Sequence, residues 1–274
     1  MQPSPLATPL AWNLVAPAYA AEVVPLFETY AREALRLAAP AAGGRLIDVA
    51  CGPGTLSLLA ARAGHPVDAV DFSPGMITEL EARLAAVGVT SIAPRLADGQ
   101  ALPFEDGSFA AGFSMFGLMF FPDRARGFAE LRRVLAPGAR AVVSSWVPLD
   151  TVPVMGAMMA AVGKELVRLL PDGPPPAPAS FPLTTEEDCR REMGAAFDRV
   201  EVHRVSHEER YASAGDLWQQ LARTMAPLVL LRRTLGEERW PEVAAGAEQA
   251  IAGALGASPA SMTMTALLSV GRAA

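Results

Sequence analysis

LIDVACGPGTLSLLA, residues 46–60, places an apolar strand, a glycine turn and a helix in direct succession. Gly52 and Gly54 let the backbone turn sharply and let a ligand approach without a Cβ in the way. The first N–H groups of the helix that follows are left open and face such a ligand. The stretch therefore predicts the ligand-binding turn of an α/β fold.

On both sides of this turn, short strands alternate with helices. We expect strands at 45–50, 66–71, 91–97, 109–116 and 139–147, with helices at 55–64, 75–88 and 122–135. Strands that alternate with helices favour a parallel sheet that is covered on both faces. Pro94 places the third strand near an edge, because proline cannot donate to a strand ladder.

The pattern changes beyond Val147, where helices predominate. Helices are expected at 152–170, 185–197, 214–235 and 237–255, a Pro-rich loop at 171–180, strands at 199–211 and 261–273, and an amphipathic helix near the start, at 17–38. The fold class is therefore α/β, with a Rossmann-like, seven-stranded and mostly parallel sheet, helices on both faces, and a helical cap.

Composition excludes several classes of protein. Of the 274 residues 51% are hydrophobic and 19% charged, which excludes a disordered chain. The net charge of −6 makes nucleic acid a poor partner. Two cysteines make no disulfide framework, the N-terminus lacks the basic region of a signal peptide, and no apolar run reaches the length of a membrane span. We therefore expect a cytoplasmic protein.

Three aspartates fall at the carboxyl ends of three successive predicted strands. Asp71 lies 23 residues after Asp48, and Asp98 follows the third strand. Parallel strands bring such positions to one crevice, although each residue alone could be a solvated cap or part of an ordinary turn. Ser57 stands where a dinucleotide fingerprint needs its third glycine, and Asp48 is poorly placed beside a pyrophosphate. The charges favour S-adenosylmethionine, which carries an ammonium and a sulfonium.

Four stretches carry a family resemblance: LIDVACGPG (46–54), VDAVDFSPGMI (67–77), LADGQALPFEDGSFAAGFSMFGLMFFPD (96–123) and ELRRVLAPGARAVVSSW (130–146). In this order they resemble class I S-adenosylmethionine-dependent methyltransferases, above all the group with quinone-biosynthesis C-methyltransferases and small-molecule O- and N-methyltransferases. The resemblance covers about residues 10–150. It is specific for fold and cofactor and says little of the acceptor.

The resemblance implies that S-adenosylmethionine, and its product S-adenosylhomocysteine, lie along the strand ends. Implied contacts are Asp48, Ala50, Cys51, Gly52, Gly54, Phe113 and Ser114 at the methionine end, Asp71, Phe72 and Met76 at the nucleoside, Asp98, Gly99 and Gln100 at the adenine, and Tyr19 from an N-terminal lid. Ala50 replaces the family's usual first glycine, which indicates a need for a small side chain rather than a positive φ. The implied organisation is a lid region at 1–40, a cofactor-binding core at 41–148, and cap helices with the last two strands at 149–274.

Apolar residues near the crevice indicate a small, largely apolar acceptor, aromatic or of quinone or secondary-metabolite type, methylated on O, N or C. The candidate pocket residues are Trp12, Met115, Met119, Phe121, Trp146, Met155, Met159, Trp218 and Met225, each of which could equally be a core residue. A homodimer is left open.

Few residues could act as a base. The stretch after the fourth strand has Met119 and Phe120 where relatives often have a histidine, which favours catalysis by proximity and desolvation. His207 is a candidate base if its strand end borders the pocket. His203 and His207 lie too far apart on a strand to share a metal ion, and no metal is expected. A nucleotide-dependent oxidoreductase and a non-catalytic cofactor-binding regulator are the alternatives.

Overall fold

The structure is a computed structural model that describes residues 4–170, 182–255 and 260–274. The expected Pro-rich loop at 171–180 lies outside the described residues.

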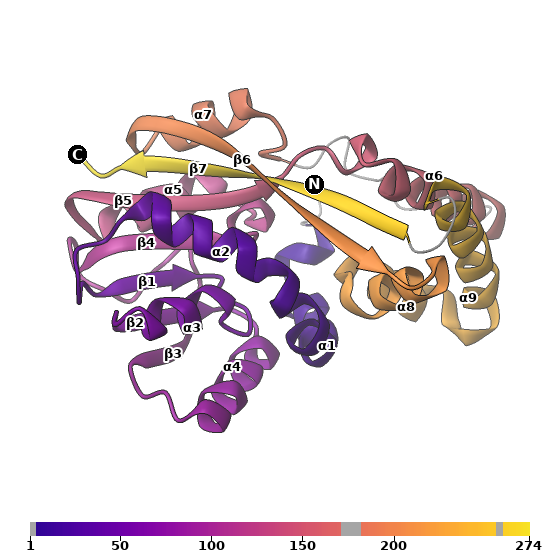
Figure 1. Cartoon of the computed structure of the whole chain (residues 1–274), viewed down its shortest axis with the longest axis horizontal. Coiled ribbons are helices and arrows are strands. Elements are labelled where there is room, and N and C mark those ends of the chain that lie inside the picture. The colour runs from indigo at the N-terminus through magenta and orange to yellow at the C-terminus, as the bar shows by residue number, and fades with distance from the viewer. Residues whose placement is uncertain (1–3, 171–181, 256–259) are drawn as a thin grey trace.

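One seven-stranded sheet forms the centre of the molecule, in the order β3-β2-β1-β4-β5-β7-β6 (Figure 1). The first five strands pair in parallel, and β7 runs antiparallel to both of its neighbours. The strands are β1 (Leu46–Val49), β2 (Val67–Asp71), β3 (Ile92–Leu96), β4 (Phe109–Met115), β5 (Leu135–Trp146), β6 (Asp198–Tyr211) and β7 (Ala260–Arg272). This confirms the predicted sheet, and β3, which contains Pro94, lies at its edge.

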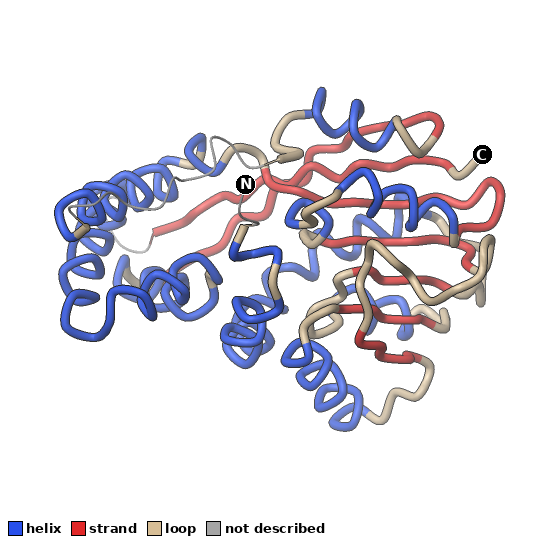
Figure 2. The backbone as a smooth tube through the Cα atoms, turned by 180° about the vertical axis from the view of Figure 1, so that it is seen from behind, coloured by secondary structure: helices blue, strands red, loops and turns tan. Residues whose placement is uncertain are grey.

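Helices cover both faces of the sheet. Neighbouring residues of a strand point to opposite faces, and here both sets are apolar and need a covering layer. Leu46 joins a core with Tyr30, Leu56 and Leu80 on one side. Ile47 joins a second core on the other side, with residues of α5 and α7. Figure 2 shows helices on both faces of the sheet from behind. The helices are α1 (Pro9–Ala18), α2 (Val24–Ala38), α3 (Thr55–Arg62), α4 (Pro74–Val87), α5 (Arg124–Arg133), α6 (Pro153–Leu169), α7 (Glu186–Gly194), α8 (Ala214–Thr224) and α9 (Ala226–Leu255).

The N-terminal helix begins earlier than the sequence pattern predicts, at Pro9 instead of residue 17. Proline is tolerated in the first turn, where its missing N–H has no intrahelical partner. A π-helical turn at Tyr19–Val23 lies between Pro17 and Pro25 and connects α1 with α2, and the Val24 N–H donates to the Tyr19 carbonyl. The two prolines therefore shift the hydrogen-bond register without ending the helix.

The joined run Pro9–Ala38 is long and apolar enough to cross a membrane by length and composition, with a window of mean hydropathy 1.3 that is 28% buried. Core helices and signal sequences pass the same test, so this finding is weak support for a span. This helical run is longer than the predicted helix at 17–38, because α1 adds the residues before position 17.

The cap has an apolar core of its own, in which Trp218 stacks on Trp240 with ring centroids 5.7 Å apart. The expected single helix at 214–235 is interrupted: α8 ends at Thr224, and α9 begins at Ala226 with Pro227 in its first turn. Gly236 has non-helical φ and ψ angles, so α9 bends where the sequence analysis separates two helices.

The last two strands connect the sheet to the cap. β7 pairs with β5 only from Ala266 to Arg272, whereas its pairing with β6 begins at Ala260. Residues 206–211 and 260–265 therefore form a two-stranded ribbon that extends past β5 toward the cap helices (Figure 1).

Candidate functional site

Two adjoining cavities open beside the carboxyl ends of the strands. The first, about 280 Å³, lies at the ends of β1, β2 and β4 under α1, and the second, about 220 Å³, lies between α2, the ribbon and α8. The residues that line both are Leu6, Trp12, Tyr19, Phe27, Phe116 and Phe120. These six residues form a shared, mainly aromatic wall.

A buried carboxylate without a full set of partners lies in the first cavity. Asp48 is 1% exposed, and the Ser57 hydroxyl donates to its Oδ2 at 2.6 Å. The other oxygen, Oδ1, has no hydrogen-bond partner. Burial raises the pKa of Asp48 to about 7. Ser57, which the sequence pattern marks only as a missing glycine, thus positions this carboxylate.

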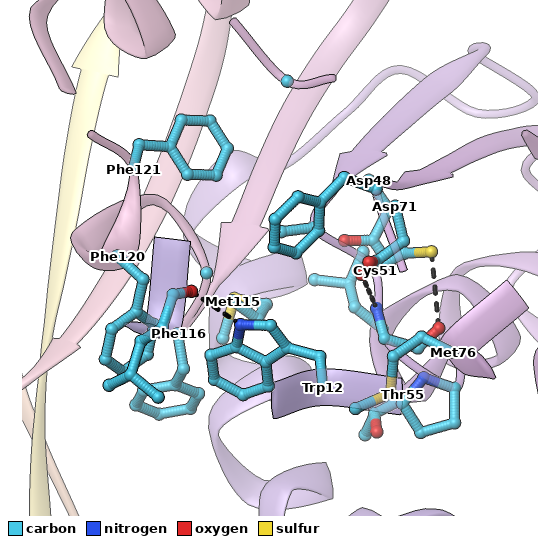
Figure 3. Close-up of a pocket in the computed structure, with 18 of the residues that line it drawn as sticks. Trp12, Asp48, Cys51, Thr55, Asp71, Met76, Met115, Phe116, Phe120 and Phe121 are labelled. Carbon is cyan, nitrogen blue, oxygen red and sulfur yellow. Dashed lines mark hydrogen bonds between the residues drawn. The ribbon is translucent and has the colours of Figure 1, made fainter. Parts of the chain in front are cut away.

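Asp71 ends β2 and faces the same cavity. Its Oδ2 accepts the Gly52 N–H and its Oδ1 accepts the Ser73 N–H, both at 2.9 Å. Burial raises the pKa of Asp71 to about 6, although these backbone donors oppose the shift. The glycine turn therefore connects the ends of β1 and β2 through one carboxylate (Figure 3).

The turn after β1 corrects one expectation from the sequence. Ala50 has φ = +57°, in the left-handed region, so this position requires a positive φ as well as a small side chain. A Cβ on Gly117 would lie 2.3 Å from the Ala50 Cβ. Glycine at 117 is therefore what lets the end of β4 approach this turn.

Most residues implied as cofactor contacts line the first cavity: Tyr19, Asp48, Ala50, Cys51, Gly52, Asp71, Phe72, Met76, Asp98, Gly99 and Gln100. Gly54, Phe113 and Ser114 lie outside its lining. A Cβ on Gly54 would lie 2.4 Å from Leu80 Cδ1, so this glycine serves packing against α4. Phe113 is fully buried below the strand end, and the Ser114 hydroxyl accepts the Leu118 N–H.

The expected acceptor residues divide between the cavities. Met115 and Phe121 line the first, Trp12 lines both, and Met119, Trp146, Met155 and Met225 line the second. Met159 and Trp218 line neither. Met159 is 40% exposed on α6, and Trp218 is 1% exposed in the cap core, because residues at helical spacing also supply the outer and core faces of cap helices.

An aromatic cluster that the sequence analysis did not assemble lies at the shared wall. Phe116 stacks on Trp146 with ring centroids 4.1 Å apart, and Phe27 and Tyr30 from α2 pack around them. Phe116 has φ = +58°, and its N–H donates to the Ser144 hydroxyl at 2.9 Å. Phe27 and Tyr30 are on the apolar face of the predicted helix, but their meeting with Phe116 depends on tertiary packing.

His207 lies at the second cavity, so the condition attached to this candidate base is met. Glu209, Tyr211, Met262 and Met264 line the same cavity and were missed, although their alternate positions on two strands are a signal of a shared face.

The other two histidines lie elsewhere. His203 contacts Glu201, and His65 contacts the Gly44 carbonyl near the opposite strand ends, as expected for a loop residue. Within the described ranges no group of three or more His, Cys, Asp or Glu side chains could hold a metal ion.

Helix α1 covers the first cavity and packs on α4 and α9. Ala11, Val15 and Ala16 pack with Met76 and Ala226. Figure 3 shows the Trp12 indole beside Phe120, at a centroid distance of 5.1 Å.

Hydrogen bonds hold this helix in place. The Asn13 Oδ1 accepts from the Ser73 hydroxyl at 2.7 Å and from the Gly75 N–H at 2.9 Å. The side chain of Asn13 therefore adds two hydrogen bonds to the packing of α1 on α4.

Comparisons with known proteins agree with this geometry. Residues 46–138 match the family model described as a methyltransferase domain. The ubiquinone/menaquinone biosynthesis C-methyltransferase UbiE of Geobacter sulfurreducens is 31% identical over 180 residues, which cover 59% of this chain and 67% of that protein. Demethylmenaquinone methyltransferase of Clavibacter sepedonicus is 40% identical over 49% of this chain and 56% of its own.

Other curated relatives match over a shorter span. Proteins of Mycobacterium tuberculosis named only as uncharacterized are 37% and 41% identical, and the chain spans 48% and 38% of their lengths.

Solved structures share the fold at low sequence identity. The YcgJ protein of Bacillus subtilis aligns with a TM-score of 0.60 at 16% identity, over 88% of this chain and 97% of that one. A structure titled as the [4+2]-cyclase SpnF aligns with a TM-score of 0.62 at 18% identity, over 98% and 97%. Because its title names a cyclase, the fold alone leaves the reaction open. The fold, the matched methyltransferase domain and the similarity to UbiE together show that the chain belongs to the class I S-adenosylmethionine-dependent methyltransferases.

Proposed function

We propose that this chain transfers a methyl group from S-adenosylmethionine, bound in the first cavity, to a small and largely apolar acceptor in the second cavity. One observation carries the proposal: an acid-lined cavity at the strand ends shares an aromatic wall with an apolar cavity of similar size. A cofactor and an acceptor placed on the two sides of this wall would lie next to each other.

The charges of the first cavity fit this cofactor. Asp48 Oδ1 is a buried acceptor without a partner, and an ammonium group would satisfy it. No Lys, Arg or His belongs to the described lining, so a pyrophosphate would meet carboxylates and no cation. This distribution supports S-adenosylmethionine over the dinucleotide of an oxidoreductase.

Each end of the cofactor has residues to hold it. Asp48 and the glycine turn would bind the methionyl ammonium, and Asp71 would accept from the ribose hydroxyls. Asp98, whose Oδ1 accepts the Gln100 N–H at 2.8 Å, would accept from the adenine amino group. When bound, S-adenosylmethionine supplies an electrophilic methyl group.

The chain promotes methyl transfer by aligning the two reactants and by excluding water from them. Holding two reactants in line at about 3–3.5 Å contributes roughly 7–11 kcal/mol. Trp12 and Tyr19 present aromatic rings that would stabilise cationic charge beside the shared wall. Burial and the nearby Asp71 raise the pKa of Tyr19, so its phenol stays protonated at neutral pH. Proximity and desolvation therefore dominate this mechanism.

The acceptor that suits the second cavity is aromatic or of quinone type. Aromatic and methionine side chains make up much of its lining, and methionine conforms to irregular apolar ligands. The names of the two quinone-pathway relatives support the same class. We propose a secondary metabolite or quinone intermediate as acceptor, a cytoplasmic location, and a division into lid (1–40), core (41–148) and cap (149–274).

The test begins with cofactor binding. Calorimetry should show that S-adenosylhomocysteine binds, and that Asp71→Asn weakens binding by about tenfold to a hundredfold, the value of a hydrogen bond to a charged group. Asp106→Asn is the matched control, because Asp106 is exposed and pairs with Arg133 away from the cavity.

Transfer itself is tested with methyl-labelled S-adenosylmethionine and a panel of reduced naphthoquinones, phenols and arylamines. Labelled product supports the proposal. Binding without label transfer to any of these classes would favour a non-catalytic regulator, and no binding would exclude the cofactor.

A further inference from the structure

The second cavity is mainly apolar, with polar side chains on the ribbon and at Thr184, Gln220 and Thr224. Among the described residues that line it, His207 and Glu209 are those with basic or acidic side chains. They lie two residues apart on β6 and therefore point to the same face of the strand. Their side chains are 30% and 31% exposed, so both remain accessible to a bound molecule.

The side chains of His207 and Glu209 are hydrogen-bonded to each other. His207 Nε2 lies 3.1 Å from Glu209 Oε2. A carboxylate can only accept, so the imidazole donates from Nε2, and in the neutral ring of that tautomer Nδ1 is an acceptor. Nδ1 lies 3.4 Å from the Thr29 hydroxyl, which is a long contact that a ligand could replace. The pair therefore offers hydrogen-bond acceptors to the cavity.

The neighbouring phenols are weaker hydrogen-bond acceptors than the Glu209 carboxylate, because each keeps its proton. The Tyr30 hydroxyl donates to the Met264 carbonyl at 2.9 Å. Burial, with a smaller contribution from Glu209, raises the pKa of Tyr211 to about 12, so its phenol also stays protonated at neutral pH.

Position separates the pair from the transferred methyl group. Neither residue lines the first cavity. The Tyr30 ring packs against both His207 and Phe116 of the shared wall, with centroid distances of 6.3 Å and 5.5 Å. The geometry therefore favours a role in holding the far end of the acceptor over proton abstraction at the methylated atom.

We propose that His207 and Glu209 bind a hydrogen-bond donor, a hydroxyl or an amine, at the end of the acceptor remote from the methylated atom. This deepens the proposed function and rests on the second cavity being the acceptor site. The substrate class becomes an aromatic molecule with a polar donor at one end and an apolar body against Phe116 and Trp146.

The experiment measures binding of matched aromatic probes, 2-naphthol against 2-methoxynaphthalene and 2-naphthylamine against its N,N-dimethyl derivative. Tryptophan fluorescence reports binding, because Trp146 lines the cavity. Each titration is run with and without saturating S-adenosylhomocysteine, so that the first cavity cannot account for the preference. We expect the donor member of each pair to bind about tenfold tighter.

The preference should fall to less than twofold in His207→Phe and Glu209→Gln. His203→Phe and Glu201→Gln are the matched controls, because His203 and Glu201 have the same spacing on the same strand, lie 3.4 Å apart and line neither cavity. These controls should keep the preference.

Equal binding within both pairs, no binding of any probe, or an unchanged preference in the two cavity variants would overturn the inference. If S-adenosylhomocysteine still binds in that case, the proposed function stands. If S-adenosylhomocysteine fails to bind while the preference persists, only the proposed function fails.

Discussion

In the proposed function, Asp48 is the residue on which cofactor binding depends most directly. An ionised carboxylate that is buried without a partner is costly, so the folded protein favours its neutral form. The folded pKa of about 7 lies above the ordinary value of 3.8. This group therefore stabilises the ligand-free fold fully below about pH 4, and the contribution is lost as the pH rises through about 7. An ammonium ligand has the opposite preference, for the ionised form.

Cofactor affinity should therefore rise with pH. Asp48 must release its proton to bind an ammonium, so we expect S-adenosylhomocysteine affinity to increase about tenfold per unit up to pH 7 and to level off above it. Protonation of Asp71, with its pKa of about 6, steepens the dependence below pH 6. Calorimetry between pH 5.5 and 8.5 measures this. Asp48→Asn should bind more weakly and lose the change near pH 7, and a flat wild-type profile would contradict the assignment.

Phe116 combines backbone strain with a central packing position. A non-glycine residue in the left-handed region is destabilised by about 1–2 kcal/mol. Removal of the ring by Phe116→Ala should destabilise the fold by about 3–5 kcal/mol. Phe116→Gly should be about 1 kcal/mol more stable than the alanine variant, which reverses the usual order, because glycine accepts a positive φ. Urea denaturation of both variants gives the difference, and the ordinary order would refute strain at this position.

Some of these residues are predictable from the sequence and others are not. Asp48, Asp71 and Asp98 could be placed together because each follows a strand of one parallel sheet. The positive φ of Phe116 could not, since it is imposed by a hydrogen bond from its own N–H to Ser144, 28 residues away.

At the scale of elements, helix α1 covers the first cavity and is hydrogen-bonded to the start of α4. The Asn13 carbonyl oxygen receives two hydrogen bonds from the start of α4. A Cβ on Gly75 would lie 3.0 Å from the Asn13 Cα, so the two helices already touch at this point. The amide of Asn13 therefore supplies the polar part of a contact that is otherwise close packing of the two helices.

Replacement of this amide should loosen the lid without unfolding it. We expect Asn13→Ala to raise the dissociation rate of S-adenosylhomocysteine about fivefold to tenfold, the value of about one net hydrogen bond. Stopped-flow fluorescence of Trp12 reports the rate. Thr78→Ala is the control, because this hydroxyl bonds within α4. Equal rates in Asn13→Ala and wild type would show that α1 does not gate the cavity.

Helices and strands are predicted correctly where the hydrophobic pattern and the flanking turn residues agree. Strands β1, β2 and β4 end near the predicted residues because each is an apolar run beside a turn signal. The helix start at Pro9 and the break at Met225 were missed. In both places proline lies in the first turn of a helix, where it begins the element although the sequence suggests an interruption.

At the scale of the whole molecule, the two adjoining cavities are built from different parts of the chain, and the ribbon lines only the second. All residues that line the first cavity lie between Leu6 and Pro122, within the lid and the sheet domain. The second cavity adds residues from the ribbon, α6 and α8. Contacts between segments this far apart in the chain follow from tertiary packing and cannot be predicted from local sequence patterns. The sequence pattern therefore predicts Trp218 as a pocket residue and misses Met264.

The two cavities should therefore respond differently when the cap is weakened. Trp240 is 7% exposed in the cap core and stacks on Trp218, so Trp240→Ala should destabilise the cap by about 3–5 kcal/mol. We expect faster hydrogen exchange in α8 and α9, unchanged protection in β1 and β4, and at least tenfold weaker binding of 2-naphthol.

S-adenosylhomocysteine affinity should stay within twofold in the same variant, because none of the cap residues that the structure describes lines the first cavity. Phe128→Ala is the matched control: this ring is 1% exposed on α5, in the core beneath the sheet, so its loss should weaken protection of β1 and β4 first. A parallel loss of S-adenosylhomocysteine affinity and β1 protection in Trp240→Ala would mean that sheet and cap unfold as one cooperative unit. The ribbon would then transmit instability from the acceptor side to the cofactor side, instead of isolating the two.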